Sequence, residues 1–274
     1  MDQFGSNLVV TFREETPNPL RDTWYRALRD RFRPSALIAK TRSVDPRRSA
    51  SKVVFGDVEP DVLVREGPSR YIVRLDEGFQ TGLFLDLRPL RDWLSETSGT
   101  GETLNLFAYT GSLSVRAAMA GSRRVTSVDA SRRALRWARQ NMQVSGQDPD
   151  RHRWFRDDVM TFLRRVPDAR YQTVIADPPA TGSSGSKRFH LRHDLHVLMK
   201  HLVRVTRPGG HLAFATHDPT SGPAHIEAVL TKAMRDLDRR GTMRRLDSDF
   251  DFPTNGADFG PYLTMVVTTI HLSP

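Results

Sequence analysis

The chain has 274 residues, of which 38% are hydrophobic and 27% are charged, and this composition suits a soluble globular protein. It contains no cysteine, which excludes disulfide bonds and thiolate chemistry. No apolar run approaches the roughly 20 residues of a membrane span, and the first residues lack the basic and apolar regions of a signal peptide. We therefore expect a cytoplasmic protein without membrane contact, large enough for one α/β domain and a small appendage.

The net charge of +9 is concentrated near the start of the chain. Residues 21–52, called the basic stripe below, contain ten basic and three acidic residues, a surplus of +7. Such a stripe attracts polyanions through phosphate contacts and counterion release. RNA is therefore an expected partner, and a solvated arginine-rich face without a partner is the alternative.

The first hundred residues predict a small α+β module. Asn7–Arg13 alternates apolar and polar residues as a strand does, and Leu20–Phe32 carries apolar residues at helical spacing as far as Pro34. Further strands are predicted at Ala36–Thr41, Val62–Arg65 and Tyr71–Leu75, with a polar loop at Ser43–Ser51. We place this module at residues 1–94, ahead of a linker at Ser95–Glu102.

Strand and helix signals alternate in the remainder of the chain. The expected strands are Leu104–Phe107, Val125–Val128, Arg153–Phe155, Thr173–Ala176 and His211–Ala215, followed by a β-rich run at Leu263–His271. The expected helices are Ser112–Ala120, Ser131–Ser145, Val159–Val166, Leu191–Val205 and Pro223–Arg239. This alternation is typical of a doubly wound parallel α/β sheet, so residues 95–274 are expected to form the larger domain.

A glycine turn and a later carboxylate indicate a nucleoside site. Gly111 follows the strand at Leu104–Phe107 and opens the next helix, whose free N–H groups face a ligand. Asp129 ends the next strand, at the distance from the glycine turn where a carboxylate accepts ribose hydroxyls. The G-x-G-x-x-G pattern of dinucleotide sites is missing, so a smaller adenosine-type cofactor fits better.

Two further carboxylates follow strands. Asp158 is positioned to accept from an adenine amine, and its neighbour Asp157 could cap the following helix. Asp177 ends the fourth strand, and Pro178 and Pro179 give it a rigid, extended exit. A carboxylate there can orient a substrate amine toward an electrophilic methyl group. We expect no metal, because the regularly spaced His190, His193 and His196 lack a clustered carboxylate or cysteine partner.

These motifs resemble those of class I S-adenosylmethionine-dependent methyltransferases, and more narrowly the 23S ribosomal RNA large-subunit methyltransferases I and K. The resemblance covers roughly residues 60–274 and includes the distinctive block Asp76–Arg88, Leu106–Gly111, Val128–Ser131 and Asp177–Pro179. It implies a Rossmann-like fold and S-adenosylmethionine as the cofactor. The implied cofactor-binding residues are Thr81, Phe84, Asp86, Arg88, Asn105, Phe107, Tyr109, Thr110, Gly111, Asp129, Asp158 and Asp177. The expected catalytic residues are Asp177, Pro178, Tyr109 and His217.

The chain departs from these relatives in two places. We expect no counterpart of their extra N-terminal RNA-binding domain, and Ala180-Thr181-Gly182 stands where an aromatic residue usually follows the Asp-Pro-Pro motif. Methylation of pyrimidine C5 needs a cysteine nucleophile, and this chain has none. The primary prediction is therefore N-methylation of RNA, with a ribosomal RNA-like substrate.

Two alternatives remain open. One is a small-molecule enzyme on the same scaffold, such as an azetidine-2-carboxylate synthase, which cyclises S-adenosylmethionine and releases methylthioadenosine. In that reaction Asp177, Tyr109, Asn105 and His217 would hold and deprotonate the cofactor amine. The other is a binding module without catalysis, against which the retained carboxylates argue. The sequence gives no indication of the oligomeric state.

Overall fold

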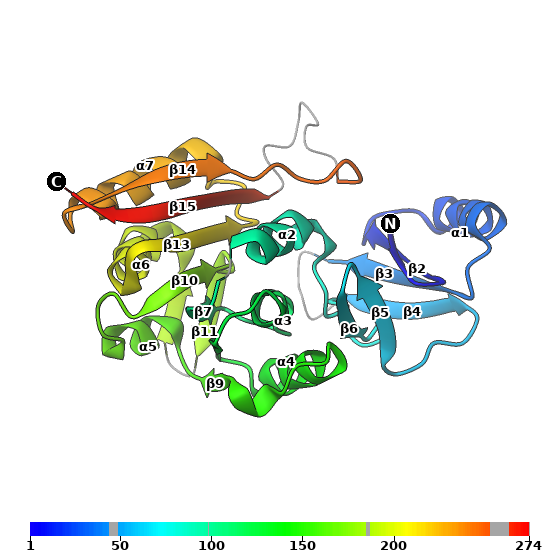
Figure 1. The fold of residues 1–274 in the computed structure, drawn as a ribbon. Helices are drawn as coiled ribbons and strands as arrows, with labels where there is room; N and C mark the ends of the chain where they lie inside the picture. The colour runs from blue at the N-terminus through cyan, green and yellow to red at the C-terminus, as the bar shows by residue number, and fades with distance from the viewer. Residues whose placement is uncertain (44–48, 98, 185–186, 253–262, 274) are drawn as a thin grey trace. The chain divides into compact units, whose positions relative to one another are not determined.

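The computed structural model describes residues 1–43, 49–97, 99–184, 187–252 and 263–273. The chain forms two compact units, Met1–Phe84 and Leu85–Pro274, both drawn in Figure 1. Among the described residues, no helix is both long and apolar enough to cross a membrane.

The first unit has a four-stranded sheet, in the order β1-β2-β3-β4, and a separate hairpin. The sheet strands are β1 (Asp2–Phe4), β2 (Asn7–Arg13), β3 (Ala36–Arg42) and β4 (Ala50–Phe55), and the hairpin strands are β5 (Val62–Glu66) and β6 (Ser69–Val73). Helix α1 (Asn18–Phe32) connects β2 to its parallel neighbour β3. Its buried Leu28 packs with Leu8, Phe12 and Leu37 of the sheet, which gives this unit its own core.

The second unit is built on a seven-stranded sheet in the order β14-β15-β13-β10-β7-β8-β9. Its strands are β7 (Glu102–Leu106), β8 (Arg124–Asp129), β9 (Arg153–Arg156), β10 (Tyr171–Ala176), β13 (Thr206–Thr216), β14 (Arg239–Arg245) and β15 (Thr264–Leu272). Five strands run parallel, whereas β15 pairs antiparallel with β13 and with β14. The expected doubly wound sheet is confirmed, with an antiparallel pair added at one edge.

Helices cover both faces of this sheet (Figure 1). Helices α2 (Arg88–Thr97), α3 (Ser112–Met119) and α4 (Arg132–Val144) form one contiguous layer, and α5 (Val159–Arg165), α6 (Leu191–Val205) and α7 (Pro223–Arg235) form the other. Leu104, Val174 and Phe214, from three neighbouring strands, are fully buried in the core beside α6 and α7. A sheet that is covered on both faces accounts for the short apolar runs Val174–Ala176 of β10 and Leu212–Ala215 of β13.

Several elements differ from the expectations. Strands β4 and β14, helix α2 and the hairpin of β11 (Thr181–Ser184) and β12 (Lys187–His190) were not predicted, and Arg239 begins a strand rather than ending a helix. The predicted loop at Ser43–Ser51 lies partly outside the described residues, and its end belongs to β4.

The division between the units falls at residues 84 and 85, ten residues before the expected domain boundary. Helix α2 belongs with the second unit because it packs on α3. The Arg116 guanidinium of α3 donates to the Arg91 carbonyl and pairs with Asp92 at 2.7 Å.

Candidate functional site

Polar side chains gather where the parallel strands of the second unit end. Leu106, the last residue of β7, pairs with Ala176 of β10 on one side and with Val128 of β8 on the other. Phe107, Asp129 and Asp177 therefore emerge at the same edge of the sheet. The connections from β7 and from β10 lead to opposite sides, so this edge includes the topological switch point, where open α/β sheets bind ligands.

The loop between β7 and α3 has an unusual backbone. Phe107, Tyr109 and Gly111 have φ angles of 56°, 49° and 75°, in the left-handed region that residues other than glycine rarely adopt. Backbone and side-chain contacts hold it there: the Tyr109 N–H donates to Asp129, and the Asn141 amide donates to the buried Thr110 carbonyl at 2.8 Å. Strain of this kind persists where the surrounding structure enforces it, often at ligand sites.

Asp129 joins this loop to the start of α4. Its Oδ2 accepts the Tyr109 N–H and its Oδ1 accepts the Ser131 N–H, each at 2.8 Å. Burial raises the pKa of Asp129, and these two hydrogen bonds partly oppose the rise. An ionised carboxylate has about four acceptor positions. The remaining positions could accept the paired hydroxyls of a ribose, and this contact stays a prediction.

Asn105 and Gly111 have clear structural partners. The buried Asn105 amide donates to Ser114 Oγ, which in turn bonds Ser127 Oγ, so the network links β7, α3 and β8. A Cβ at Gly111 would lie 2.7 Å from the Cβ of Ala138. Glycine is therefore required here by the close approach of α3 and α4, whether or not a ligand also lies close. A cofactor contact for either residue stays a prediction.

Asp158, rather than Asp157, is the residue that caps α5. Its Oδ1 accepts the Thr161 N–H at 2.8 Å and the Thr161 hydroxyl at 2.7 Å. The Asp157 carboxylate accepts the Asp158 N–H and pairs with Arg165. The alternative considered from the sequence thus assigned the cap to the wrong neighbour, and the adenine contact of Asp158 stays a prediction.

Asp177 belongs to a cluster of three titratable groups. Asp86 in the short helix η2 (Leu85–Leu87) is 3% exposed, and its Oδ2 lies 2.7 Å from His217 Nε2. His217 directly follows β13, and Asp177 directly follows β10. Burial raises the pKa of Asp177 to about 7, while positive charge on His217 lowers it and the Asp86 carboxylate raises it. The neighbouring Pro178 is buried.

Three other implied cofactor residues, Arg88, Thr81 and Phe84, lie in other parts of the structure. Arg88 donates to Asp249 at 2.9 Å and to both oxygens of Asp251 at 3.1 and 3.3 Å, which ties α2 to the segment after β14. Thr81 and Phe84 belong to the first unit, where the Thr81 carbonyl accepts the Arg74 N–H. Their assignments to the cofactor site are untested.

The structure adds an aromatic residue that the sequence did not indicate. Gly182 of β11 pairs with Phe189 of β12, and the Phe189 ring lies 5.3 Å from the Phe107 ring. The hairpin therefore brings an aromatic side chain to the loop after β7. The sequence contained only a weak indication of this hairpin, because the polar Thr181–Ser184 segment lacks the alternating apolar residues of a typical strand.

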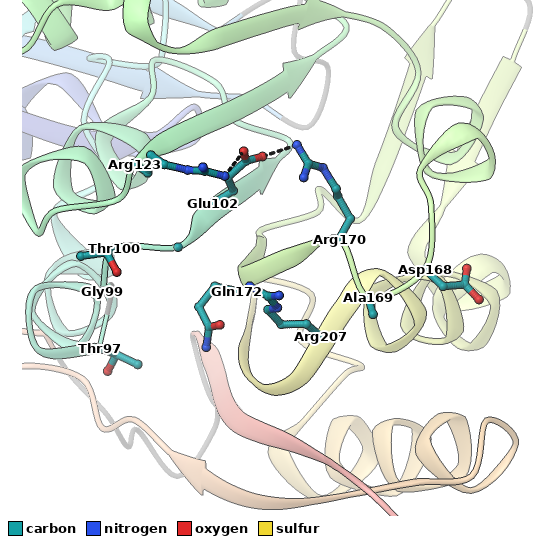
Figure 2. A pocket seen from close by; sticks show the side chains of 11 residues that line it. Thr97, Gly99, Thr100, Glu102, Arg123, Asp168, Ala169, Arg170, Gln172 and Arg207 are labelled. Atoms are coloured by element: carbon teal, nitrogen blue, oxygen red, sulfur yellow. Dashed lines mark hydrogen bonds and ion pairs between the residues drawn. The ribbon is translucent and has the colours of Figure 1, made fainter.

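A hollow of about 850 Å³ lies at the opposite edge of the sheet (Figure 2). Its lining includes Glu102 and Arg170, which lie at or just before the starts of β7 and β10. The buried Glu102 carboxylate pairs with Arg123 at 2.8 Å and with Arg170 at 2.5 Å, as Figure 2 shows. Because Glu102 is already paired with Arg123 and Arg170, and because this is the amino edge of the sheet, we assign the site to the carboxyl edge instead.

Within the described ranges, no group of three or more His, Asp and Glu side chains is arranged to hold a metal ion. His196 of the predicted histidine series lies 3.1 Å from Asp236.

A family model described as S-adenosylmethionine-dependent methyltransferase matches residues 5–263. The chain belongs to this family. Over 154 residues the methyltransferase is 38% identical to the ribosomal RNA large subunit methyltransferase K/L of Alcanivorax borkumensis, which corresponds to 56% of this chain and 22% of that protein. The chain thus matches only a minor part of that relative. The expected family is confirmed.

Solved structures agree on the fold. A protein described as a methyltransferase and solved with SAH superposes with a TM-score of 0.85 at 23% identity, over 97% of this chain and 70% of that one. The SAM-dependent methyltransferase from Agrobacterium tumefaciens gives a TM-score of 0.70 at 19% identity, over 94% and 83% of the two chains. The expected Rossmann-like fold is confirmed, and the cofactor is S-adenosylmethionine.

The residues of the carboxyl edge fit this cofactor. Asp129 retains acceptor capacity for ribose hydroxyls, as described above. Asp86 Oδ1 is buried and accepts no hydrogen bond from the described residues. A buried acceptor without a donor is costly, so it favours a ligand that brings donors and positive charge. S-adenosylmethionine carries hydroxyls, an ammonium group and a sulfonium.

Proposed function

We propose that this methyltransferase transfers a methyl group to a nitrogen of RNA, with a ribosomal RNA-like substrate. The observation that carries the proposal is the 38% identity with a ribosomal RNA large subunit methyltransferase over 154 residues. Nitrogen is favoured over pyrimidine C5 because the chain has no cysteine to serve as the nucleophile.

The proposed mechanism depends on positioning. When bound, S-adenosylmethionine supplies a methyl group that a nucleophile can displace from sulfur. Asp129, which accepts the Tyr109 N–H, would hold the ribose, and the strained loop from Phe107 to Gly111 would help to hold the cofactor. Asp177 and the carbonyl of Pro178 receive the N–H groups of the acceptor and direct its lone pair toward the methyl carbon. Tyr109 and His217 are the other two residues that we expect to take part in catalysis. Such alignment is a large source of rate enhancement.

The structure separates the basic stripe into two groups of residues. Arg21 donates to three backbone carbonyls, and Arg42 lies over the Phe79 ring at 5.0 Å. The buried Lys40 ammonium donates to the Gly78 carbonyl, and burial lowers its pKa to about 8. Arg47 and Arg48 lie outside the described residues. The contacts of Arg21, Arg42 and Lys40 therefore support the fold of the first unit.

The second group is exposed. Arg26, Arg29 and Arg31 lie on the exposed surface of α1, and Arg33 follows its last turn. Trp24, on the same helix, is 50% exposed. Guanidinium groups bind phosphates, and an exposed aromatic ring stacks on unpaired bases. We propose α1 as the surface of this chain that contacts RNA.

The experiment compares products with and without RNA. The protein is incubated with methyl-labelled S-adenosylmethionine and unmodified ribosomal RNA transcripts, and nucleosides and small molecules are analysed by mass spectrometry. We expect label in an N-methylated nucleoside, formed only when RNA is present and lost in Asp177→Asn. Methylthioadenosine and a cyclic amino acid formed without RNA would instead establish the azetidine-2-carboxylate alternative.

A further inference from the structure

The hairpin of β11 and β12 follows directly on the Asp-Pro-Pro motif, and the mechanism above gives it no role. Ala180 alone separates Pro179 from β11, and β12 leads straight into α6. The Leu191 N–H donates to the Ala180 carbonyl at 3.0 Å, so the two ends of the hairpin meet beside the motif. Asp177 and Ala180 are three residues apart, so their Cα atoms lie within about 11 Å of each other. The base of the hairpin is therefore close to the candidate catalytic carboxylate.

Packing fixes the inner face of this hairpin. Phe189 of β12 is 6% exposed, and its ring lies 5.3 Å from the ring of Phe107 in the loop after β7. Gly182 of β11 lies so near to Pro179 that an added Cβ would be 3.5 Å from the proline Cγ. The hairpin is thus held against two segments of the candidate site, the loop after β7 and the Asp-Pro-Pro motif.

The outer face of β12 continues into the first turn of α6. Side chains alternate between the two faces of a strand, so Arg188 and His190 lie on the face opposite to the buried Phe189, and both are exposed. Arg192 and His193 of α6 are also exposed. The rings of His190 and His193 have centroids 6.1 Å apart, so the strand and the helix contribute to one surface. We call Arg188, His190, Arg192 and His193 the hairpin patch.

The segment that carries this patch has a positive charge. Residues 187–194 contain three basic residues and one acidic residue, Asp194, a surplus of +2. The Asp194 carboxylate accepts the His190 N–H at 2.9 Å. If Asp218, which lies near Arg192, is counted as well, the surplus is still +1. Guanidinium groups bind phosphates in a fixed geometry, and histidine rings stack on unpaired bases.

We propose that the hairpin patch binds the RNA backbone beside the acceptor nucleotide and so positions that nucleotide at Asp177. The inference rests on the proposed function and deepens it, because it names a second RNA surface, in the same unit as the catalytic carboxylate. Phosphate contacts fix the register of a nucleic acid without reading its sequence. Helix α1 of the first unit adds affinity for RNA, whereas the hairpin patch determines which nucleotide reaches the site.

The first test places one crosslinker beside the patch, which is practical because the chain has no cysteine of its own. Thr181 is exposed and pairs with His190 across the hairpin, so both side chains lie on the same face. Thr181→Cys, labelled with a photo-crosslinker, retains all four patch residues. The matched control is Thr242→Cys, at an exposed threonine of β14. Each labelled protein is irradiated with unmodified ribosomal RNA transcripts, and the crosslinked nucleotides are mapped by primer extension.

The expected result is a cluster of crosslinks from Thr181→Cys within a few nucleotides of the methylated position. Thr242→Cys should give weaker crosslinks at scattered positions. Because crosslinking needs binding and not turnover, the RNA contact is measured independently of methyl transfer.

The second test removes the two charges of the patch. Arg188→Gln combined with Arg192→Gln should raise the KM for RNA about tenfold, and should lower the salt slope of RNA binding by about 1.5, because two phosphate contacts are lost. The affinity for S-adenosylmethionine, measured by calorimetry, should be retained. The control combines Arg235→Gln with Arg240→Gln, two exposed arginines of α7 and β14, and so removes the same charge elsewhere in this unit. It should leave the KM close to that of the parent protein.

The inference and the proposed function fail in different ways. If RNA is methylated but Thr181→Cys crosslinks no differently from Thr242→Cys, or crosslinks far from the methylated nucleotide, the inference is overturned. An equal rise in KM for both pairs of arginine variants would also overturn it, because net charge would then explain the effect. If Thr181→Cys crosslinks RNA selectively but no nucleotide gains a methyl group, the proposed function fails and the hairpin patch remains an RNA-binding surface.

Discussion

At the scale of single residues, Gly111 shows how packing shapes the loop after β7. Its φ of 75° is unfavourable for any residue with a Cβ, and that Cβ would lie 2.7 Å from Ala138. We expect Gly111→Ala to lose about 1–2 kcal/mol from backbone strain and roughly a further 1–3 kcal/mol from overpacking, measured by urea unfolding.

Gly146 is the matched control for this prediction. It has nearly the same φ, 76°, but a Cβ there meets no atom within 4 Å. Gly146→Ala should therefore show only the strain of about 1–2 kcal/mol. In an Ala138→Gly background, Gly111→Ala should cost less stability than in the parent protein, because the Cβ–Cβ contact is absent and the helical cost of about 1 kcal/mol for glycine at 138 is common to both proteins compared. Equal losses for both glycine variants would show that α4 does not limit this position.

The predicted contact with the cofactor ribose depends on Asp129. Asp129→Asn retains the shape but loses the charge, and one of the two backbone N–H groups loses its acceptor. We expect the affinity for S-adenosylmethionine, measured by calorimetry, to fall by about tenfold or more, since hydrogen bonds to charged groups contribute roughly 1.5–3 kcal/mol. Asp157→Asn, at the end of the neighbouring strand and paired with Arg165, should leave the affinity unchanged. If Asp129→Asn also binds normally, the ribose assignment is wrong.

At the scale of elements, Asp158 combines a cap with a predicted cofactor contact, and two substitutions separate them. Serine retains N-capping, so Asp158→Ser should preserve stability, whereas Asp158→Ala should lose about 1 kcal/mol. If Asp158 also accepts from the adenine amine, both variants should lose cofactor affinity in calorimetry. A loss confined to the alanine variant would assign Asp158 to the helix alone.

Most of the elements that the sequence predicted have an apolar pattern. Strands β10 and β13 carry the short apolar runs Val174–Ala176 and Leu212–Ala215, and β7 is buried throughout. The residues that end or follow the parallel strands, Asp129 and Asp177 among them, could therefore be placed at one edge. Strand β14 has four arginines in seven residues and forms through backbone pairing with β15. Helix α2 was not predicted, although its sequence carried a helical signal: Leu90, Trp93 and Leu94 have helical spacing and are buried.

The candidate site was predictable to a similar degree. Residue type and spacing located Asp129 and Asp177, whereas the partners of their side chains depend on distant segments. The contact between Asp86 and His217 joins residues 131 positions apart, so no local pattern could indicate it. The Asn105 amide likewise bonds Ser114 in a network that joins α3 and β8, and strand position alone does not reveal this contact.

At the scale of the whole molecule, we propose that the catalytic domain begins at Leu85 rather than at Ser95. Helix α2 buries Leu90, Trp93 and Leu94, and Arg116 bonds its backbone. A domain that began at Ser95 would leave this surface of α3 uncovered. The division therefore places the distinctive block at Asp76–Arg88 across the junction of the two units.

The exposed arginines of the first unit give the final prediction. Reversing Arg26, Arg29, Arg31 and Arg33 to glutamate should weaken RNA binding at least tenfold and reduce its salt dependence, because phosphate contacts and released counterions are lost. The control reverses four exposed bases of the second unit, Lys232, Arg235, Arg240 and Arg244, and so changes the net charge equally. Binding is measured by fluorescence anisotropy across salt concentrations, and calorimetry checks that cofactor affinity is retained. A loss specific to the α1 variant would show that position, rather than net charge, determines RNA binding. Equal losses of RNA affinity in both variants would show that the basic stripe acts only through the overall charge of the protein.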